Sequence, residues 1–193
     1  MDAFVALLVE WQRTTNLVAP STIPRLWTRH IADSLQLVDL APGARTWVDL
    51  GSGGGFPGIP IACALTDMPG TAIHLIESNS RKAAFLREAA RVTAAPAVVH
   101  AERIENFVVR FADPVDAVCA RALASLDDLL NLAFPQLGKT GTIGLFPKGR
   151  SAGVELAQAS NRWAMHATMA ASRTDADARI IVVRNVERRA GAP

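Results

Sequence analysis

The sequence contains no tyrosine, two cysteines and three lysines among its 193 residues. Without tyrosine, the chain lacks the Tyr-x-x-x-Lys proton donor expected of a nicotinamide-dependent reductase, so that class of enzyme is disfavoured. Any stacking on nucleic-acid bases is left to Trp and Phe side chains. Cys63 and Cys119 stand alone within apolar segments and match no metal-ligand spacing, so we expect no metal site.

Long apolar runs and signal sequences are also missing. No stretch approaches the length of a membrane-spanning helix, and the N-terminus from Met1 to Phe4 lacks the basic region of a signal peptide. Two isolated cysteines suit a reducing compartment, so we expect a cytoplasmic protein with no membrane association. The net charge of +2 does not by itself indicate a nucleic-acid partner. Arginine outnumbers lysine 17 to 3, so phosphate contacts would use planar, bidentate guanidinium groups.

The most informative stretch runs from Thr46 to Ile61 and reads T-W-V-D-L-G-S-G-G-G-F-P-G-I-P-I. It predicts a strand, a glycine-rich turn and a helix, the order that brings backbone N–H groups close to a ligand. Glycine permits the positive φ angles and the close approach that such a turn requires. Asp49 lies at the carboxyl end of the predicted strand, where open α/β sheets bind ligands.

A second acidic residue, Glu77, ends the next predicted strand, and in a βαβ unit its carboxylate would lie beside a ribose. Counted from Gly51, the dinucleotide fingerprint G-x-G-x-x-G fails because Phe56 occupies its last position. The pattern acidic-x-Gly-x-Gly-x-Gly, from Asp49 to Gly55, instead resembles motif I of the S-adenosylmethionine-dependent methyltransferases. A glycine-rich turn without a ligand is the alternative. Gly138-Lys139-Thr140 resembles the end of a P-loop, but Ala133 occupies the position of the required glycine five residues earlier. We therefore reject ATP or GTP binding there.

Strand-like and helix-like segments alternate after Thr46, which predicts a Rossmann-like α/β fold with a mostly parallel seven-stranded sheet. The predicted strands are Trp47–Leu50, Ala72–Glu77, Ala97–His100, Asp116–Ala120 and Thr142–Phe146, followed by an antiparallel edge pair, Met165–Ala171 and Ile180–Asn185. The predicted helices between strands are Gly58–Thr66, Ser80–Val92, Ser125–Gln136 and Val154–Trp163. Helical periodicity in Asp2–Asn16 and Pro24–Leu40 predicts an N-terminal helical cap, residues 1–44, in one domain with residues 45–193.

Several stretches together resemble one family, the 16S ribosomal RNA guanine-N7 methyltransferases, once named glucose-inhibited division protein B. The resemblance covers roughly Leu7 to Arg150, and the Gly-Phe-Pro-Gly-Ile-Pro end of the glycine loop is its most specific part. The stretches are Asn16–Val18, Arg29–Ser34, Val48–Pro60, Arg81–Arg87, Arg103–Glu105 and Ala120–Leu126. Family members carry a further helical stretch before the segment that begins here at Met1, so we expect part of the cap to be missing.

The resemblance implies a class I methyltransferase fold with S-adenosylmethionine as cofactor. Gly51, Gly53 and Gly55 would pass under the methionine part, with Phe56 beside it, and Glu77 would accept hydrogen bonds from both ribose hydroxyls. The family pattern further implies that Ile104 and Glu105 contact the adenine. A surface carboxylate at Glu77, and a simple helix start at Ile104, are the alternatives from the residues alone. The complete set of expected cofactor residues is Asp49, Gly51, Gly53, Gly55, Phe56, Glu77, Ile104, Glu105 and Arg121.

Arg121 follows the fourth predicted strand and is the candidate catalytic residue. The segment Ala120–Leu123 carries no Asn/Asp-Pro-Pro-aromatic motif for exocyclic amines, and Cys119 lacks the context of carbon-5 pyrimidine enzymes. Guanine N7 has a free lone pair, so its methylation needs no general base and can rest on alignment of donor and acceptor. Arg121 could orient the guanine O6/N7 edge, as bidentate geometry allows. An ion pair with a neighbouring acid is the alternative.

The implied partner is 16S ribosomal RNA or the small ribosomal subunit, with guanine 527 of the 530 loop as the family's target, and we expect a monomer. The expected RNA contacts are Arg25, Arg29, His30, Arg81, Lys82, Lys148 and Arg150. Arg29 could instead pair with Asp33 at i,i+4, and His30 could be a satisfied cap residue. Other interpretations of the whole chain are a methyltransferase for another RNA or a small molecule, a nicotinamide-dependent oxidoreductase, and a non-catalytic RNA-binding domain.

Overall fold

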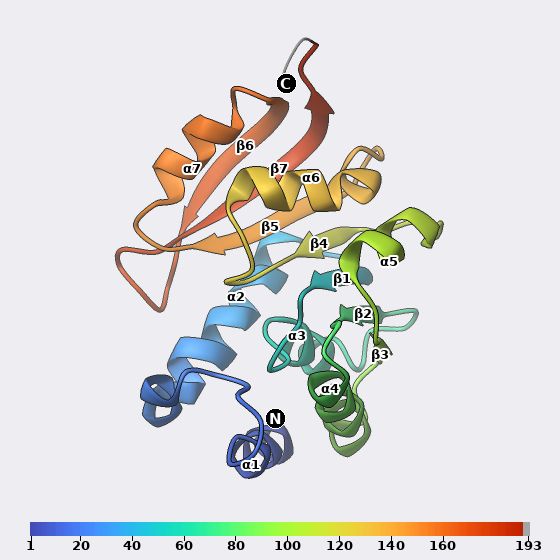
Figure 1. Cartoon of the computed structure of the whole chain (residues 1–193), viewed down its shortest axis with the longest axis vertical. Helices are drawn as coiled ribbons and strands as arrows, with labels where there is room; N and C mark the ends of the chain where they lie inside the picture. The colour runs from blue at the N-terminus through green and yellow to red at the C-terminus, as the bar shows by residue number, and fades with distance from the viewer. Residues whose placement is uncertain (191–193) are drawn as a thin grey trace.

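The computed structural model describes residues 1–190, whose strands form one seven-stranded sheet (Figure 1). The strands are β1 (Thr46–Leu50), β2 (Ala72–Ile76), β3 (Ala97–His100), β4 (Ala117–Cys119), β5 (Ile143–Lys148), β6 (Trp163–Ala171) and β7 (Arg179–Arg188). Their order is β3-β2-β1-β4-β5-β7-β6, with β1 to β5 parallel and β7 antiparallel to both β5 and β6. The predicted Rossmann-like sheet with an antiparallel edge pair is confirmed. Its strand order reverses between β1 and β4, the place where such sheets bind ligands.

Helices cover both faces of this sheet. Successive side chains of β1 point to opposite faces, and each face has its own hydrophobic core. Trp47 belongs to one core cluster and Val48 to the other, and both are fully buried. Strands buried on both faces require mostly apolar sequence, which β4 provides throughout and β1 and β2 provide apart from Thr46, Asp49 and His74. The helices that follow the strands are α3 (Gly58–Ala64), α4 (Ser80–Thr93), α5 (Ile104–Arg110), α6 (Leu126–Leu137) and α7 (Ala152–Ala159).

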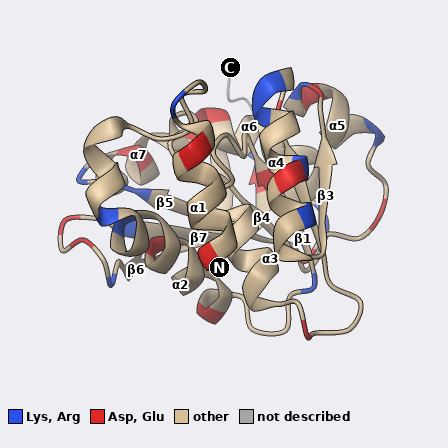
Figure 2. Ribbon diagram, turned by 90° about the horizontal axis from the view of Figure 1, so that it is seen from below, with Lys and Arg blue, Asp and Glu red and all other residues tan. Residues whose placement is uncertain are grey.

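The N-terminal cap is helical, but its second predicted helix is divided into three pieces. These are the 3₁₀ helix η1 (Pro20–Arg25), the π-helix η2 (Trp27–Ala32) and α2 (Asp33–Leu40). Pro20 and Pro24 lack an amide hydrogen, which favours a short 3₁₀ turn over a continuous α-helix at this point. α1 (Asp2–Trp11) lies beside α4, as the view from below also shows (Figure 2), and the Trp11 and Phe85 rings are 5.7 Å apart. The cap therefore shares the core of the sheet.

Two further segments differ from the sequence prediction. Ile104–Arg110 forms α5, which has only seven residues and a short apolar pattern, so periodicity alone did not predict it. α7 ends at Ala159, and Trp163 begins β6 instead of ending the helix. The Trp163 indole donates to Asp127 at 2.8 Å and is buried against α6, a tertiary contact that overrides helix propensity. Among residues 1–190, no helix is both long and apolar enough to cross a membrane.

Candidate active site

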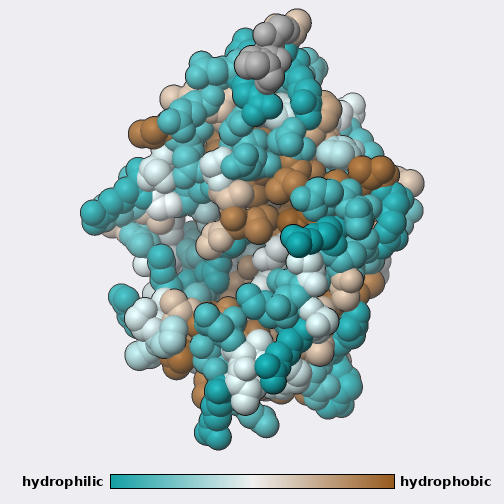
Figure 3. Space-filling view, viewed as in Figure 1, coloured by the Kyte–Doolittle hydropathy of each residue, from teal (hydrophilic) through white to brown (hydrophobic). Residues whose placement is uncertain are grey.

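A cavity of about 890 Å³ opens at the carboxyl ends of the parallel strands. Its walls come from the glycine loop after β1, the loops after β2, β3, β4 and β5, the cap and the β6–β7 hairpin. Figure 3 shows this face of the molecule hollowed near its centre, with apolar surface beside the hollow. Seven of the nine expected cofactor residues line the cavity: Gly51, Gly53, Phe56, Glu77, Ile104, Glu105 and Arg121. Asp49 and Gly55 lie outside its wall.

The glycine loop turns on left-handed residues. Gly51, Gly53 and Gly55 have φ angles of +70°, +53° and +88°. At Gly51 a Cβ would stand only 2.8 Å from a methyl carbon of Leu123, so glycine keeps this floor of the cavity open. Gly55 serves the fold, because its carbonyl oxygen accepts the Ile59 amide at 2.8 Å as α3 begins.

Glu77 connects the loops after β1 and β2. Its side chain is nearly buried, with the residue 9% exposed, and lines the cavity. One carboxylate oxygen accepts the Gly53 amide at 3.0 Å, and the other accepts the Asn79 amide at 2.7 Å. Asn79 in turn caps α4 by accepting the amides of Arg81 and Lys82. The carboxylate is thus fixed in place by backbone donors, and it is not a free surface acid.

Asp49 lies beneath the loop and does not reach the cavity. Its carboxylate is fully buried, accepts the Gly58 amide at 3.1 Å and lies 3.9 Å from the Cys119 sulfur. A Cβ on Gly58 would lie 2.7 Å from this carboxylate, so only glycine fits beside Asp49 at position 58. Burial raises the pKa of Asp49 from 3.8 to about 6. The geometry therefore suits a residue that shapes the glycine loop from below.

Replacing Asp49 by Asn should change the pH dependence of stability. The folded chain binds the Asp49 proton more tightly than the unfolded chain does, so protonated Asp49 contributes to the free energy of unfolding of the wild type. This contribution is lost as pH rises from about 4 to about 6. The full shift corresponds to about 3 kcal/mol, and Asn, which does not ionise, avoids that penalty. Urea unfolding of both proteins should show a gain for D49N that grows between pH 4 and pH 8. A gain that does not vary with pH would contradict the raised pKa.

Gly54 is where the glycine loop touches the cap. A Cβ there would stand 2.7 Å from the Leu17 carbonyl oxygen, and Gly54 has no positive φ angle. Gly54→Ala should therefore act only by pushing the cap away, which should cost about 1–3 kcal/mol and weaken cofactor binding. Thermal unfolding and calorimetry measure both effects. Gly153→Ala in α7 is the matched control, because nothing lies within 4 Å of its Cβ position: it should leave cofactor binding unchanged and stabilise the protein slightly, since alanine is the better helix former.

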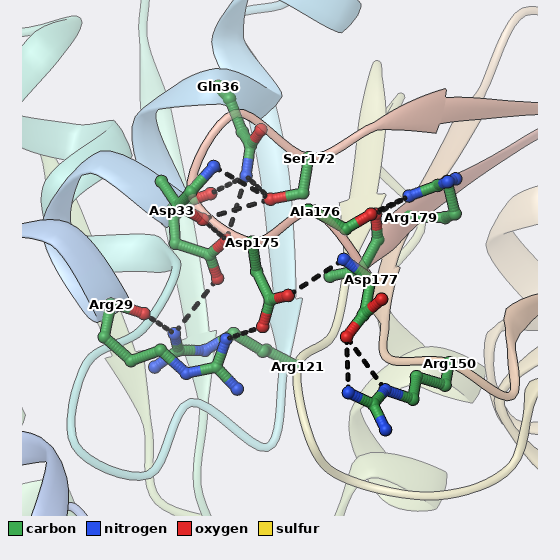
Figure 4. Close-up of polar contacts among 12 residues, drawn as sticks. Arg29, Asp33, Gln36, Arg121, Arg150, Ser172, Asp175, Ala176, Asp177 and Arg179 are labelled. Carbon is green, nitrogen blue, oxygen red and sulfur yellow. Dashed lines mark hydrogen bonds and ion pairs between the residues drawn. The ribbon is translucent and has the colours of Figure 1, made fainter.

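Arg121 is held by the cap through several contacts, as Figure 4 shows in part. Its guanidinium donates to the Arg29 carbonyl at 3.1 Å, to His30 Nδ1 at 2.5 Å and to Asp33 Oδ2 at 3.4 Å. The group also lies 5.1 Å from the centre of the Phe56 ring. Burial lowers the pKa of Arg121 from its usual value, with Asp33 opposing the effect, and the side chain is 17% exposed. The ion pair considered as an alternative is present, with Asp33.

His30 is a buried member of the cap. Since arginine only donates hydrogen bonds, Nδ1 of His30 accepts from Arg121 and Nε2 carries the hydrogen that Thr22 Oγ1 accepts at 2.8 Å. Burial and the nearby charges of Arg121 and Arg29 lower the pKa of His30 to about 4, so it is neutral at pH 7. Its ring lies 4.8 Å from the Phe56 ring. One ring nitrogen is thus engaged within the cap, by Thr22, and the other by Arg121 of the loop after β4.

The remaining basic residues divide into three groups. Arg25 and Arg81 are exposed and lie away from the cavity wall, whereas Lys82 lines it. Lys148 also lines the cavity, but its side chain is only 10% exposed, and its Nζ pairs with Glu155 at 2.8 Å and donates to the Ala124 carbonyl. Arg29 and Arg150 are exposed and paired with acids of the β6–β7 hairpin. The i,i+4 pair of Arg29 with Asp33, considered as an alternative, does not form: Arg29 pairs with Asp175, and Asp33 pairs with Arg121.

Sequence reasoning missed three parts of the site. Asp33, the first residue of α2, connects Arg121 to the hairpin: its Oδ2 accepts from Arg121, and its Oδ1 accepts from Thr174 Oγ1 at 2.7 Å. Leu123 covers Gly51, and Arg103 precedes α5 on the cavity wall. Residues 174–177 connect the two strands predicted as the edge pair, and no contact was predicted for them. Two aspartates within four residues, Asp175 and Asp177, were the available signal that this turn meets basic residues elsewhere.

Comparisons with known proteins agree with this geometry. A family model described as rRNA small subunit methyltransferase G matches residues 1–181. Among curated proteins, ribosomal RNA small subunit methyltransferase G of Bradyrhizobium sp. (strain BTAi1) is 53% identical over 188 residues, which are 97% of this chain and 84% of that protein. The protein of the same name from Methylobacterium sp. (strain 4-46) is 54% identical over 182 residues, covering 94% and 85%.

Solved structures of lower sequence identity share the fold. An O-methyltransferase from Bacillus cereus, in complex with SAH, superposes with a TM-score of 0.64 at 15% identity, covering 95% of this chain and 91% of that one. The O-methyltransferase TomG from Streptomyces achromogenes, in complex with SAM, gives a TM-score of 0.60 at 16% identity, covering 95% and 90%.

Proposed function

We propose what this chain does from the family to which it belongs, the rRNA small subunit methyltransferase G family. It transfers a methyl group from S-adenosylmethionine to ribosomal RNA of the small subunit. The observation that carries the proposal is the convergence of Gly51, Glu77 and Arg121 on one cavity at the switch point of the sheet. We also propose that the protein acts in the cytoplasm as a monomer.

The cofactor side of the cavity fits a nucleoside that carries a methionine chain. The volume of about 890 Å³ lies in the range of small-molecule sites, and the glycine floor carries no side chains of its own, with Leu123 packed over Gly51. Each Glu77 oxygen uses one lone pair on a backbone amide and keeps another for a ribose hydroxyl. Phe56 would flank the methionine part, and Ile104 and Glu105 the adenine. Bound there, S-adenosylmethionine supplies an activated methyl group.

The acceptor side lies between Arg121, Leu123 and the cap. We propose guanine N7 as the acceptor atom, with guanine 527 of 16S ribosomal RNA as the nucleotide. N7 carries no proton at neutral pH, so no residue has to remove one. The protein then has to hold the base in line and exclude water, a contribution worth up to about 7–11 kcal/mol. The fixed guanidinium of Arg121 supports this, because it offers donors to the O6/N7 edge.

RNA would approach over the basic residues around the cavity mouth. Arg29 and Lys82 line the cavity, whereas Arg25, Arg81 and Arg150 are exposed outside its wall. His30 and Lys148 also line the cavity, but their contacts within the protein support roles in holding the cap and the loop after β4. Because phosphate contacts release counterions, RNA binding should weaken steeply as salt concentration rises.

The direct test is methyl transfer to ribosomal RNA from a strain that lacks the enzyme, with labelled S-adenosylmethionine, followed by mapping of the modified base. Label at N7 of guanine 527 is the expected result. Label on another base would remove the nucleotide assignment, and no label in RNA or subunits would remove the RNA substrate. Calorimetry with S-adenosylhomocysteine and NAD, side by side, tests the oxidoreductase alternative, which predicts binding of NAD only.

A further inference from the structure

The tip of the β6–β7 hairpin, residues 172–178, reaches across to the cap and the loop after β5 (Figure 4). Its shape is maintained by its own hydrogen bonds. The Ala178 amide donates to the Asp175 carbonyl at 3.1 Å, and the Asp177 amide donates to Asp175 Oδ1 at 3.0 Å. Arg179 donates to the carbonyls of Ala176 and Ala178. The hairpin tip is therefore held partly by its own hydrogen bonds and partly by the cap, where the Arg173 amide donates to Gln36 and Thr174 Oγ1 donates to Asp33.

Two carboxylates of the hairpin tip pair with two exposed arginines proposed for RNA binding, Arg29 and Arg150. Asp175 Oδ2 lies 3.0 Å from Arg29 Nη1, and their side chains are 37% and 46% exposed. Asp177 Oδ2 accepts two hydrogen bonds from Arg150, at 2.9 and 2.5 Å, and these side chains are 55% and 84% exposed. The Arg29 backbone is fixed separately, because its carbonyl accepts from Arg121. Only the guanidinium of each arginine is engaged by the hairpin tip.

The neighbouring pair of Arg121 with Asp33 differs in burial. Its side chains are only 17% and 10% exposed, and Asp33 is further bonded by Gln36 and Thr174. Breaking a buried, hydrogen-bonded pair is strongly unfavourable, whereas exposed pairs are weak and screened by salt. An anion that reaches this surface can thus replace Asp175 and Asp177 as partners of Arg29 and Arg150 while the inner pair stays closed.

We infer that the hairpin tip occupies the positions of RNA phosphates, and that substrate RNA binds by displacing the carboxylates of Asp175 and Asp177 from Arg29 and Arg150. The partner is a phosphodiester chain, which offers the same bidentate acceptor geometry as a carboxylate. This inference rests on the proposed function. In addition to that function, the carboxylates of Asp175 and Asp177 compete with RNA phosphates for Arg29 and Arg150. This competition lowers the affinity for any RNA that cannot engage both arginines at once.

The variant D175N/D177N tests this inference. Asn at position 175 can still accept the Asp177 amide, so the hairpin tip keeps its shape while the competing charge is gone. Filter binding to protein-free 16S ribosomal RNA should show an affinity increase of about fivefold, since each exposed pair is weak. D177N alone should give part of this gain, because the side chain of Asp177 contacts only Arg150. Unchanged affinity in both variants would overturn the inference.

A double-mutant cycle separates displacement from a general effect of charge. If RNA phosphates replace the carboxylates, the gain from D175N/D177N should vanish when Arg29 and Arg150 are already replaced by Met. A gain that persists in the R29M/R150M background would come from long-range electrostatics and would refute displacement. The wild-type methylation assay is run on the same RNA: if it succeeds while the cycle shows no coupling, only this inference fails.

Discussion

Glu77→Ala should weaken binding of S-adenosylhomocysteine by roughly 100-fold or more. Two charge-assisted hydrogen bonds to ribose would be lost, each worth about 1.5–3 kcal/mol. The loop would suffer as well, because the Gly53 and Asn79 amides lose their acceptor. Calorimetry on the purified protein gives the dissociation constant, and thermal unfolding shows whether the fold survives.

Two companion variants make this result specific. Glu77→Gln retains the size of the side chain and one amide acceptor, so it should preserve more stability than the Ala variant while still binding the ligand poorly. Glu88→Ala removes an exposed acid of α4 that pairs with Arg91 outside the site, and it should bind as the wild type does. Near-normal affinity in a folded Glu77→Ala protein would remove the ribose role.

The sequence contained enough information to predict this half of the site, because the relevant pattern is local. Asp49, Gly51 and Glu77 follow directly from strand ends and a glycine turn, and parallel strands bring their carboxyl ends to one edge. The same locality explains why Asp49 was expected to bind the cofactor although it lies beneath the loop. Its spacing placed it near the loop, but spacing does not show on which side of the loop a carboxylate lies. Its contact with Gly58 depends on the packing of α3.

The half of the site formed by the cap could not be predicted in this way. Asp33 and Thr174 are 141 positions apart, and no periodicity links them. Likewise Lys148 appears in the sequence as a charge at the end of a strand, yet its ammonium group is engaged by Glu155 and by the Ala124 carbonyl. Such contacts depend on how α2, α7 and the hairpin pack on the sheet, so residue type and position alone suggested free surface charges for side chains that have partners within the protein.

Arg121→Ala should affect both folding and methyl transfer. The variant leaves Asp33 buried without its cation, which should lower the free energy of unfolding by about 3 kcal/mol, toward the lower end for buried pairs because Gln36 and Thr174 still bond the carboxylate. Loss of a bidentate contact to guanine should lower methyl transfer by roughly 10- to 100-fold. Activity alone therefore does not separate orientation of the base from support of the cap.

The double variant D33N/R121M separates the two roles. Removing both members of the pair eliminates the uncompensated charge, and the long apolar side chain of Met can still cover Phe56, so most of the stability lost in Arg121→Ala should return. Methyl transfer should stay low if the guanidinium orients the base. Single-turnover rates at saturating cofactor, with urea unfolding of the same samples, provide the comparison. A stable double variant with the wild-type rate would assign Arg121 to the cap alone, and guanine would then have to be oriented by other groups around the cavity.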